Sequence, residues 1–193
     1  RNSLGYPSLR GANQLLNASA ALAALEVLRL ELPVGAQEVR TGLVVVELPG
    51  RFQVLPGRPT VILDVAHNPH AAAALGQNLG NMGFHPFTYA VFGIMEDKDI
   101  DGVIAPMAEF VDHWCVADLP SPRAASANKL ADKLAALRPA TAKEGEYTVS
   151  AFADPAQAFA NAMGRAGEND RIVVFGSFYT VAGVMAARKT SNH

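Results

Sequence analysis

The sequence contains few cysteines and no long apolar run, and both absences exclude classes of protein. Cys115 is the single cysteine among 193 residues, so no disulfide can form within the chain. No apolar stretch approaches the roughly 20 residues that a membrane-spanning helix needs. The first residues also lack the apolar segment of a signal peptide. We therefore expect a cytoplasmic protein that is not a membrane protein.

Charge is also scarce. Charged residues make up 18% of the chain and leave a net charge of −2, which gives no basic patch for binding nucleic acid. Hydrophobic residues make up 50%, enough to build a sizeable core. Cys115 lies in one of the apolar runs, where a small buried side chain is a more common role than a nucleophile.

Strand-like apolar runs alternate with Ala-rich segments along most of the chain. The predicted strands are residues 43–46, 52–55, 60–65, 89–92, 114–117 and 172–175. Most are continuous apolar runs, which are typical of a sheet that is buried on both faces. The alternation predicts a doubly wound, mostly parallel α/β sheet of Rossmann-like type. Residues 43–46 and 52–55 could add an antiparallel edge to it.

The first part of the chain predicts a separate, appended helix. Residues 13–30 are rich in Ala and Leu, the residues with high helix propensity, and Pro33 and Gly35 follow them. We therefore divide the chain into residues 1–35, a helix and linker, and residues 36–193, the α/β domain.

Three further helices have recognisable first residues. Asn68 and Asp154 each precede a proline at the first helical position, and Ser126 is expected to cap a third helix. That third helix should direct its leucines into the core: Leu130, Leu134 and Leu137.

Two segments place polar side chains where parallel strands end, which is where ligands bind in open α/β sheets. Asp64 closes the strand at 60–65, and His67 lies in the turn before the helix that Asn68 begins. Ser177 follows the strand at 172–175. Asp64 could hold ribose hydroxyls, and His67 could donate to a carboxylate or a phosphate. The sequence contains neither a P-loop nor a GxGxxG segment, so this chain lacks the usual cradle for a triphosphate.

Each candidate also has an ordinary structural role to weigh against a functional one. Asp64 could brace the following turn, and His67 could be a structural hydrogen-bonding residue. Ser177 has the position of a helix cap, which is the more common role. By default Arg51 is a solvated loop charge and Asn17 a residue on the outer face of a helix.

Five ordered segments together resemble the folylpolyglutamate synthase/dihydrofolate synthase family, within the Mur ligase superfamily. They are residues 9–14 (LRGANQ, followed by Asn17), 50–53 (GRFQ), 63–69 (LDVAHNP), 93–99 (GIMEDKD) and 176–180 (GSFYT). The segment 63–69 alone would also fit the Mur ligases of cell-wall synthesis. The GRFQ and GSFYT segments favour the folate branch. Glu96 stands where family members often have Arg, so no role is transferred to it.

The resemblance implies a fold, a reaction and a set of site residues. The fold is the C-terminal domain of a Mur ligase, and the reaction joins L-glutamate to a folate or dihydropteroate carboxylate through an acyl phosphate, with ATP and Mg²⁺. By motif, Asn17 would contact adenine, Arg51 the phosphates and Asp64 the ribose. His67 and Ser177 would receive glutamate.

The same resemblance implies that this chain is half of an active site. The family's P-loop, its magnesium ligands and most of its folate pocket belong to an N-terminal domain, of which residues 1–35 would be the end. Two alternatives remain open at this point: a Mur-type ligase of cell-wall peptides, and a nucleotide-binding module without catalysis.

Overall fold

The computed structural model describes residues 4–9, 11–137 and 147–191. Its contacts divide the chain into two compact units, Arg1–Gln53 and Val54–His193. The predicted boundary after residue 35 lies within the first of these units.

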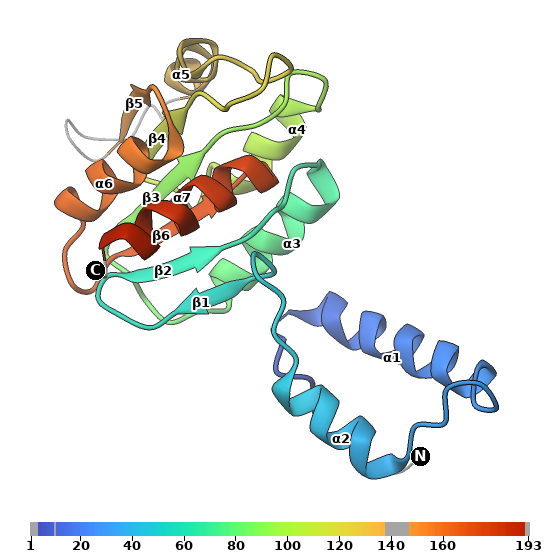
Figure 1. Cartoon of the computed structure of the whole chain (residues 1–193). Coiled ribbons are helices and arrows are strands. Elements are labelled where there is room, and N and C mark those ends of the chain that lie inside the picture. Colours follow the sequence, from blue (N-terminus) through green and yellow to red (C-terminus); the bar gives the residue numbers. More distant parts are fainter. Residues whose placement is uncertain (1–3, 10, 138–146, 192–193) are drawn as a thin grey trace. The chain divides into compact units, whose positions relative to one another are not determined.

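Unit 1 is built on two helices, α1 (Ala12–Val27) and α2 (Ala36–Val45) (Figure 1). The helix predicted at residues 13–30 is confirmed, but the strand predicted at 43–46 is wrong, because those residues form the end of α2. Val39 is buried whereas Val44 and Val45 are 67% and 64% exposed, a helical division of faces. The backbone N–H of Ser8 donates to the carbonyl of Leu43 at 2.8 Å, and the Ser8 hydroxyl donates to the carbonyl of Val46. These bonds satisfy carbonyls that a helix end leaves without partners.

Unit 2 contains a six-stranded sheet in the order β1-β2-β6-β3-β4-β5 (Figure 1). The pairings of β2 with β6, β6 with β3, β3 with β4, and β4 with β5 are all parallel. This confirms the predicted mostly parallel sheet. The strands are β1 (Gln53–Leu55), β2 (Thr60–Leu63), β3 (Thr88–Phe92), β4 (His113–Ala117), β5 (Thr148–Phe152) and β6 (Arg171–Phe175).

The strand β5 was not predicted. Its residues are only partly buried and alternate polar with apolar side chains, so the sequence has no continuous apolar run there. It lies at the end of the sheet order, where one neighbour is enough to define a strand: His113 of β4 pairs with Thr148 of β5.

Helices cover a sheet that is buried on both faces. On one face lie the helices α6 (Pro155–Arg165) and α7 (Phe178–Ser191). They pack over every second residue of the central strands: Tyr89 and Val91 of β3, Cys115 and Ala117 of β4, and Ile172 and Val174 of β6. The alternate residues point to the other face and are equally buried, among them Phe92, Trp114 and Phe175. The remaining helical elements of unit 2 are α3 (Pro69–Gly80), α4 (Ile100–Ile104), the 3₁₀ turn η1 (Ala105–Met107) and α5 (Ala127–Ala136).

The three predicted caps are confirmed by hydrogen bonds. The side chains of Asn68, Asp154 and Ser126 accept from the backbone N–H three residues later, at 2.9, 2.8 and 3.3 Å. Leu130 and Leu134 are buried as expected, but the prediction for Leu137 is wrong. Leu137 is the C-terminal cap residue of α5 and is 49% exposed, because the helix ends before it can turn this side chain inward.

Cys115 is a core residue, as the sequence predicted. It is fully buried in β4, and burial raises the pKa of its thiol to about 11. A thiol that is neutral and inaccessible is a poor nucleophile. In the described part of the chain, no helix is long and apolar enough to cross a membrane.

Candidate functional site

The carboxyl ends of β2 and β6 lie side by side, and they carry the two polar segments that the sequence singled out. Leu63 pairs with Val174 in parallel register. Just beyond, the N–H of Asp64 donates to the carbonyl of Val174, and the N–H of Gly176 donates to the carbonyl of Ala66, both at 2.9 Å. Asp64 and the residue after Gly176, Ser177, therefore lie at one edge of the sheet, as predicted.

Asp64 shapes the turn that follows β2. Its Oδ1 accepts a hydrogen bond from the N–H of Ala66 at 2.8 Å, which tightens the backbone between the strand and the helix α3. The side chain is half-buried. The carboxylate thus has the structural role considered above, and its two oxygens can accept several hydrogen bonds.

His67 presents one particular ring nitrogen to its surroundings. Nδ1 lies 2.8 Å from the carbonyl oxygen of Val65. A carbonyl can only accept, so Nδ1 carries the proton and the neutral imidazole has Nε2 as an acceptor. The ring of Phe178, on the first turn of α7, has its centroid 6.3 Å from the centroid of the imidazole. The imidazole is therefore oriented from both of the adjacent strand ends.

Ser177 is almost fully buried at the start of α7. Its Oγ accepts a hydrogen bond from the N–H of Tyr179 at 3.2 Å, and its carbonyl accepts from the N–H of Val181. This is the helix-capping role that the sequence favoured. The hydroxyl proton is still available for donation to a ligand.

Asn17 and Arg51 line a second site, which lies wholly in unit 1. It is a pocket of about 560 Å³ whose other walls are mostly apolar: Pro7, Leu9, Gln14, Ala18, Ala21, Gly42, Leu43, Val46 and Leu48. The Asn17 carboxamide donates through Nδ2 to Oε1 of Gln14 at 3.1 Å, which directs its own oxygen elsewhere. The predicted set is thus divided between the units: Asn17 and Arg51 share this pocket, and Asp64, His67 and Ser177 share the strand ends.

Acidic side chains in the segment after β3 form ion pairs with basic side chains that follow β4. Glu96 pairs with Lys129, Asp97 pairs with Arg123 at 2.8 Å, and Asp101 pairs with Lys133 at 2.8 Å. These pairs join the β3–α4 segment to the loop and helix that follow β4. The described residues include no group of three His, Cys, Asp or Glu side chains placed to hold a metal ion.

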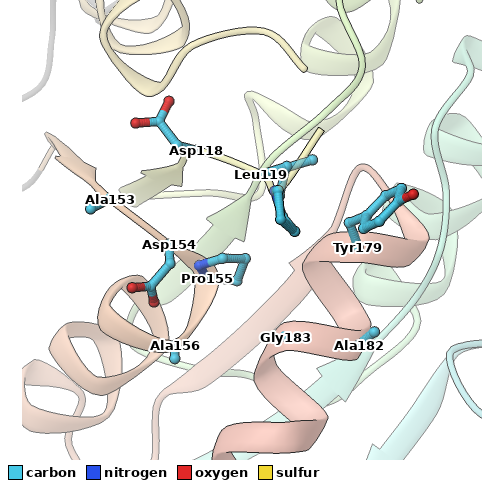
Figure 2. Close-up of a pocket in the computed structure, with 10 residues that line it drawn as sticks. Asp118, Leu119, Ala153, Asp154, Pro155, Ala156, Tyr179, Ala182 and Gly183 are labelled. Carbon is cyan, nitrogen blue, oxygen red and sulfur yellow. The ribbon is translucent and has the colours of Figure 1, made fainter. Parts of the chain in front are cut away.

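A further pocket, of about 420 Å³, lies where β4 and β5 end (Figure 2). Its two acids already serve as acceptors within the fold: Asp118 from the N–H of Ala127 at 2.7 Å, and Asp154 from that of Gln157 at 2.8 Å. Figure 2 shows both carboxylates directed away from Tyr179, so the remaining wall is mainly apolar. This pocket lacks the polar groups of a reaction centre.

Comparison with known protein families identifies the family of the chain. Residues 50–178, which include both strand ends, match the family described as Mur ligase, glutamate ligase domain. The chain belongs to the Mur ligase family.

The relatives of this Mur ligase domain are enzymes of folate metabolism by name. The dihydrofolate synthase/folylpolyglutamate synthase of Escherichia coli K12 is 40% identical over 169 residues, which is 88% of this chain and 37% of that protein. A solved structure of E. coli FolC in complex with DHPP and ADP has a TM-score of 0.84 and 36% identity, and it covers 100% of this chain and 42% of its own.

A bifunctional folylpolyglutamate synthase/dihydrofolate synthase with Mn, AMPPNP and L-glutamate bound is similarly close. Its TM-score is 0.81 at 40% identity, over 98% of this chain and 42% of its own. This Mur ligase domain therefore spans about two fifths of the length of the relatives that it matches.

Two polar residues at these sites were not singled out by sequence. Gln14 lies one helical turn before Asn17, and that spacing is the signal that could have identified it. Thr180 is buried beside Ser177 and donates from Oγ1 to the carbonyl of Gly93 at 2.7 Å. No local pattern reveals that contact, because 87 residues separate the two positions.

Proposed function

We propose that the full-length protein is a cytoplasmic, ATP-dependent ligase that adds L-glutamate to folates, and to dihydropteroate if it is bifunctional. This chain supplies its C-terminal domain. The observation that carries the proposal is the match to a glutamate ligase domain over the segment that brings Asp64, His67 and Ser177 to adjacent strand ends. The names of the relatives favour folate over a cell-wall precursor as the acceptor.

In this proposal three residues contact the nucleotide. The Asn17 carboxamide reads the adenine edge, and the apolar walls of its pocket suit a flat base. The guanidinium of Arg51 pairs with phosphate oxygens in a bidentate manner. The carboxylate of Asp64 accepts hydrogen bonds from ribose hydroxyls while its Oδ1 continues to brace the turn at Ala66.

His67 and Ser177 receive the incoming amino acid. With Nδ1 held by the carbonyl of Val65, Nε2 of His67 donates to a glutamate carboxylate when the imidazole is protonated. The Ser177 hydroxyl donates to the same ligand and accepts from the N–H of Tyr179. Both groups lie on short, hydrogen-bonded turns, which suits them to holding a ligand in one orientation.

The reaction has two steps. The acceptor carboxylate takes the γ-phosphoryl group of ATP, giving an acyl phosphate and ADP. The glutamate amine then attacks the acyl carbon, phosphate leaves with the bonding electrons, and the amine loses a proton to give the amide. The work of this domain is to bring Arg51, Asp64 and His67 to the reactants, and domain closure excludes the water that would hydrolyse the acyl phosphate.

Magnesium is proposed as the metal, since a related structure holds Mn with AMPPNP. The described residues include no group of three possible ligands, so the ion would be held by the rest of the protein. When bound, it would neutralise charge on the phosphates.

The test is ATP- and glutamate-dependent ligation, measured with a folate and with dihydropteroate as acceptors. Full-length protein should form the amide and release ADP in equal amounts, and this chain alone should form none. Turnover by this chain alone would contradict the proposed division of the active site. Ligation onto a cell-wall peptide precursor, with none onto folates, would replace the acceptor.

A further inference from the structure

A buried threonine fastens the first turn of α7 to the end of β3. Thr180 is 0% exposed, and its Oγ1 donates a hydrogen bond to the carbonyl of Gly93 at 2.7 Å. Gly93 is the residue that follows β3, the strand next to β6 on the side away from β2. This bond therefore connects the candidate site to a third strand, one that carries none of the predicted site residues.

Close backbone packing makes this connection specific. Gly176 has φ +103°, and a Cβ at that position would lie 2.5 Å from the carbonyl oxygen of Gly93 and 2.7 Å from the ring of Phe92. Only glycine fits that conformation and that space. The chain leaving β6 is thus pressed against the end of β3 at Gly176 and tied to it again at Thr180.

The residues between these two attachment points are Ser177 and Phe178, together with Tyr179. Ser177 accepts from the N–H of Tyr179, and Phe178 lies beside the imidazole of His67. Any shift of this turn relative to β3 would move the Ser177 hydroxyl and the ring that borders His67 together. No other described hydrogen bond from the side chains of residues 177–180 reaches β3 or its following loop.

We propose that Thr180 is a positioning residue for the amino-acid substrate. Its bond to Gly93 holds Ser177, and through Phe178 also His67, where they bind L-glutamate. This inference rests on the proposed function, since it takes glutamate as the ligand of those two side chains. Thr180 itself touches neither substrate nor nucleotide.

The test compares variants of the full-length enzyme by steady-state kinetics. Thr180→Val keeps the shape and removes the hydroxyl, whereas Thr180→Ser keeps the hydroxyl. Thr190→Val is the matched control, because Thr190 is an exposed residue of the same helix whose hydroxyl donates to the carbonyl of Ala186 at 3.2 Å. Thr180→Val should raise the KM for glutamate about tenfold, the factor that corresponds to one ordinary hydrogen bond.

The same variant should change the KM for ATP by less than about twofold, because the proposed nucleotide contacts are elsewhere. Thr180→Ser should restore the KM for glutamate to within about threefold of the wild type, and Thr190→Val should match the wild type. Calorimetric titration with L-glutamate should show the same order of affinities. If the valine variant does not fold, Thr180→Ala replaces it with the same expectations.

Several results would overturn the inference. One is an unchanged KM for glutamate in Thr180→Val. Another is an equal rise in the KM for ATP and for glutamate. A third is a loss of activity that is fully explained by the fraction of the variant that is unfolded, as measured by urea denaturation. These outcomes concern Thr180 alone, provided that the wild type ligates glutamate. A wild-type enzyme with no ligation would instead refute the proposed function, and the role of Thr180 with it.

Discussion

The N–H of Asp64 donates a hydrogen bond of 2.9 Å to the carbonyl of Val174, two residues that are 110 positions apart in the chain. The bond continues the parallel ladder of β2 and β6 by one step beyond the last paired residue of β2. It brings the turn that carries His67 beside the turn that carries Ser177. The candidate glutamate site therefore depends on β6 lying next to β2 in the sheet.

Asp64 should be essential in the full-length enzyme, mainly for catalysis. Asp64→Ala removes both the proposed ribose contact and the brace to the N–H of Ala66. We expect kcat/KM for ATP to fall by a factor of about 100 or more, or roughly 3 kcal/mol of transition-state stabilisation. Asp64→Asn keeps a carbonyl oxygen that can brace the turn, so it should unfold at nearly the wild-type urea concentration and still lose most activity. Full activity in the asparagine variant would leave Asp64 with a structural role only.

Arg51 should matter for the nucleotide, and a second arginine provides the control. Arg51→Ala should raise the KM for ATP and lower kcat, and Arg51→Lys should recover only part of the loss, because an ammonium group cannot bind phosphate in a bidentate manner. Arg58 is exposed and pairs only loosely with Glu168 at 3.7 Å, so Arg58→Ala should be kinetically silent. Equal effects of the two alanine variants would indicate a general loss of positive charge.

Gly176 and Gly164 should respond in opposite directions to the same substitution. Gly176→Ala places a Cβ in contact with the carbonyl of Gly93 at a positive φ, and we expect a loss of about 2 kcal/mol or more in the free energy of unfolding. Gly164 lies in α6 with nothing within 4 Å of an added Cβ, so Gly164→Ala should stabilise the protein by up to about 1 kcal/mol. Urea unfolding followed by the fluorescence of Trp114, the single tryptophan, measures both. A stable Gly176→Ala variant would show that the turn can move away from β3.

His113 should make the domain less stable in mild acid. Burial, with the nearby Arg165 guanidinium, lowers the pKa of this imidazole, whose Nδ1 lies 3.0 Å from Oγ1 of Thr148. The unfolded chain then binds the proton more readily, so the free energy of unfolding should decrease as pH falls through about 6.5. The neighbouring Asp112 has the opposite effect in a more acidic range, because burial raises the pKa of its carboxyl.

The measurement is the free energy of unfolding in urea between pH 8 and pH 5.5. His113→Asn should flatten its dependence on pH. The matched control is His70→Asn, at an exposed position in the first turn of α3, which should leave the slope unchanged. An unchanged slope in the His113 variant would show that another group controls acid stability.

Local features of the fold could be predicted from sequence because their causes are local. Asn68, Ser126 and Asp154 each accept from an N–H three residues away, so a short segment contains both partners. The central strands were predictable because burial on both faces demands continuous apolar runs. The candidate residues Asp64, His67 and Ser177 were identified for the same reason, as polar groups directly after such runs.

Other features depended on partners far away in the chain. Residues 43–46 have the β-branched composition of a strand, yet they close a helix whose last carbonyls are satisfied by Ser8. The strand β5 is defined by its pairing with β4, since its own residues lack an apolar run. In both cases tertiary contacts outweighed a weak local preference.

The sequence by itself determined the type of sheet, the starts of its main helices and the segments in which polar groups follow buried strands. The tertiary structure alone decided that β6 lies between β2 and β3, and with it that Thr180 reaches Gly93. The physical reason is the range of the forces involved. Caps and apolar patterns act over a few residues, whereas strand order follows from the packing of the whole core, which no short segment encodes.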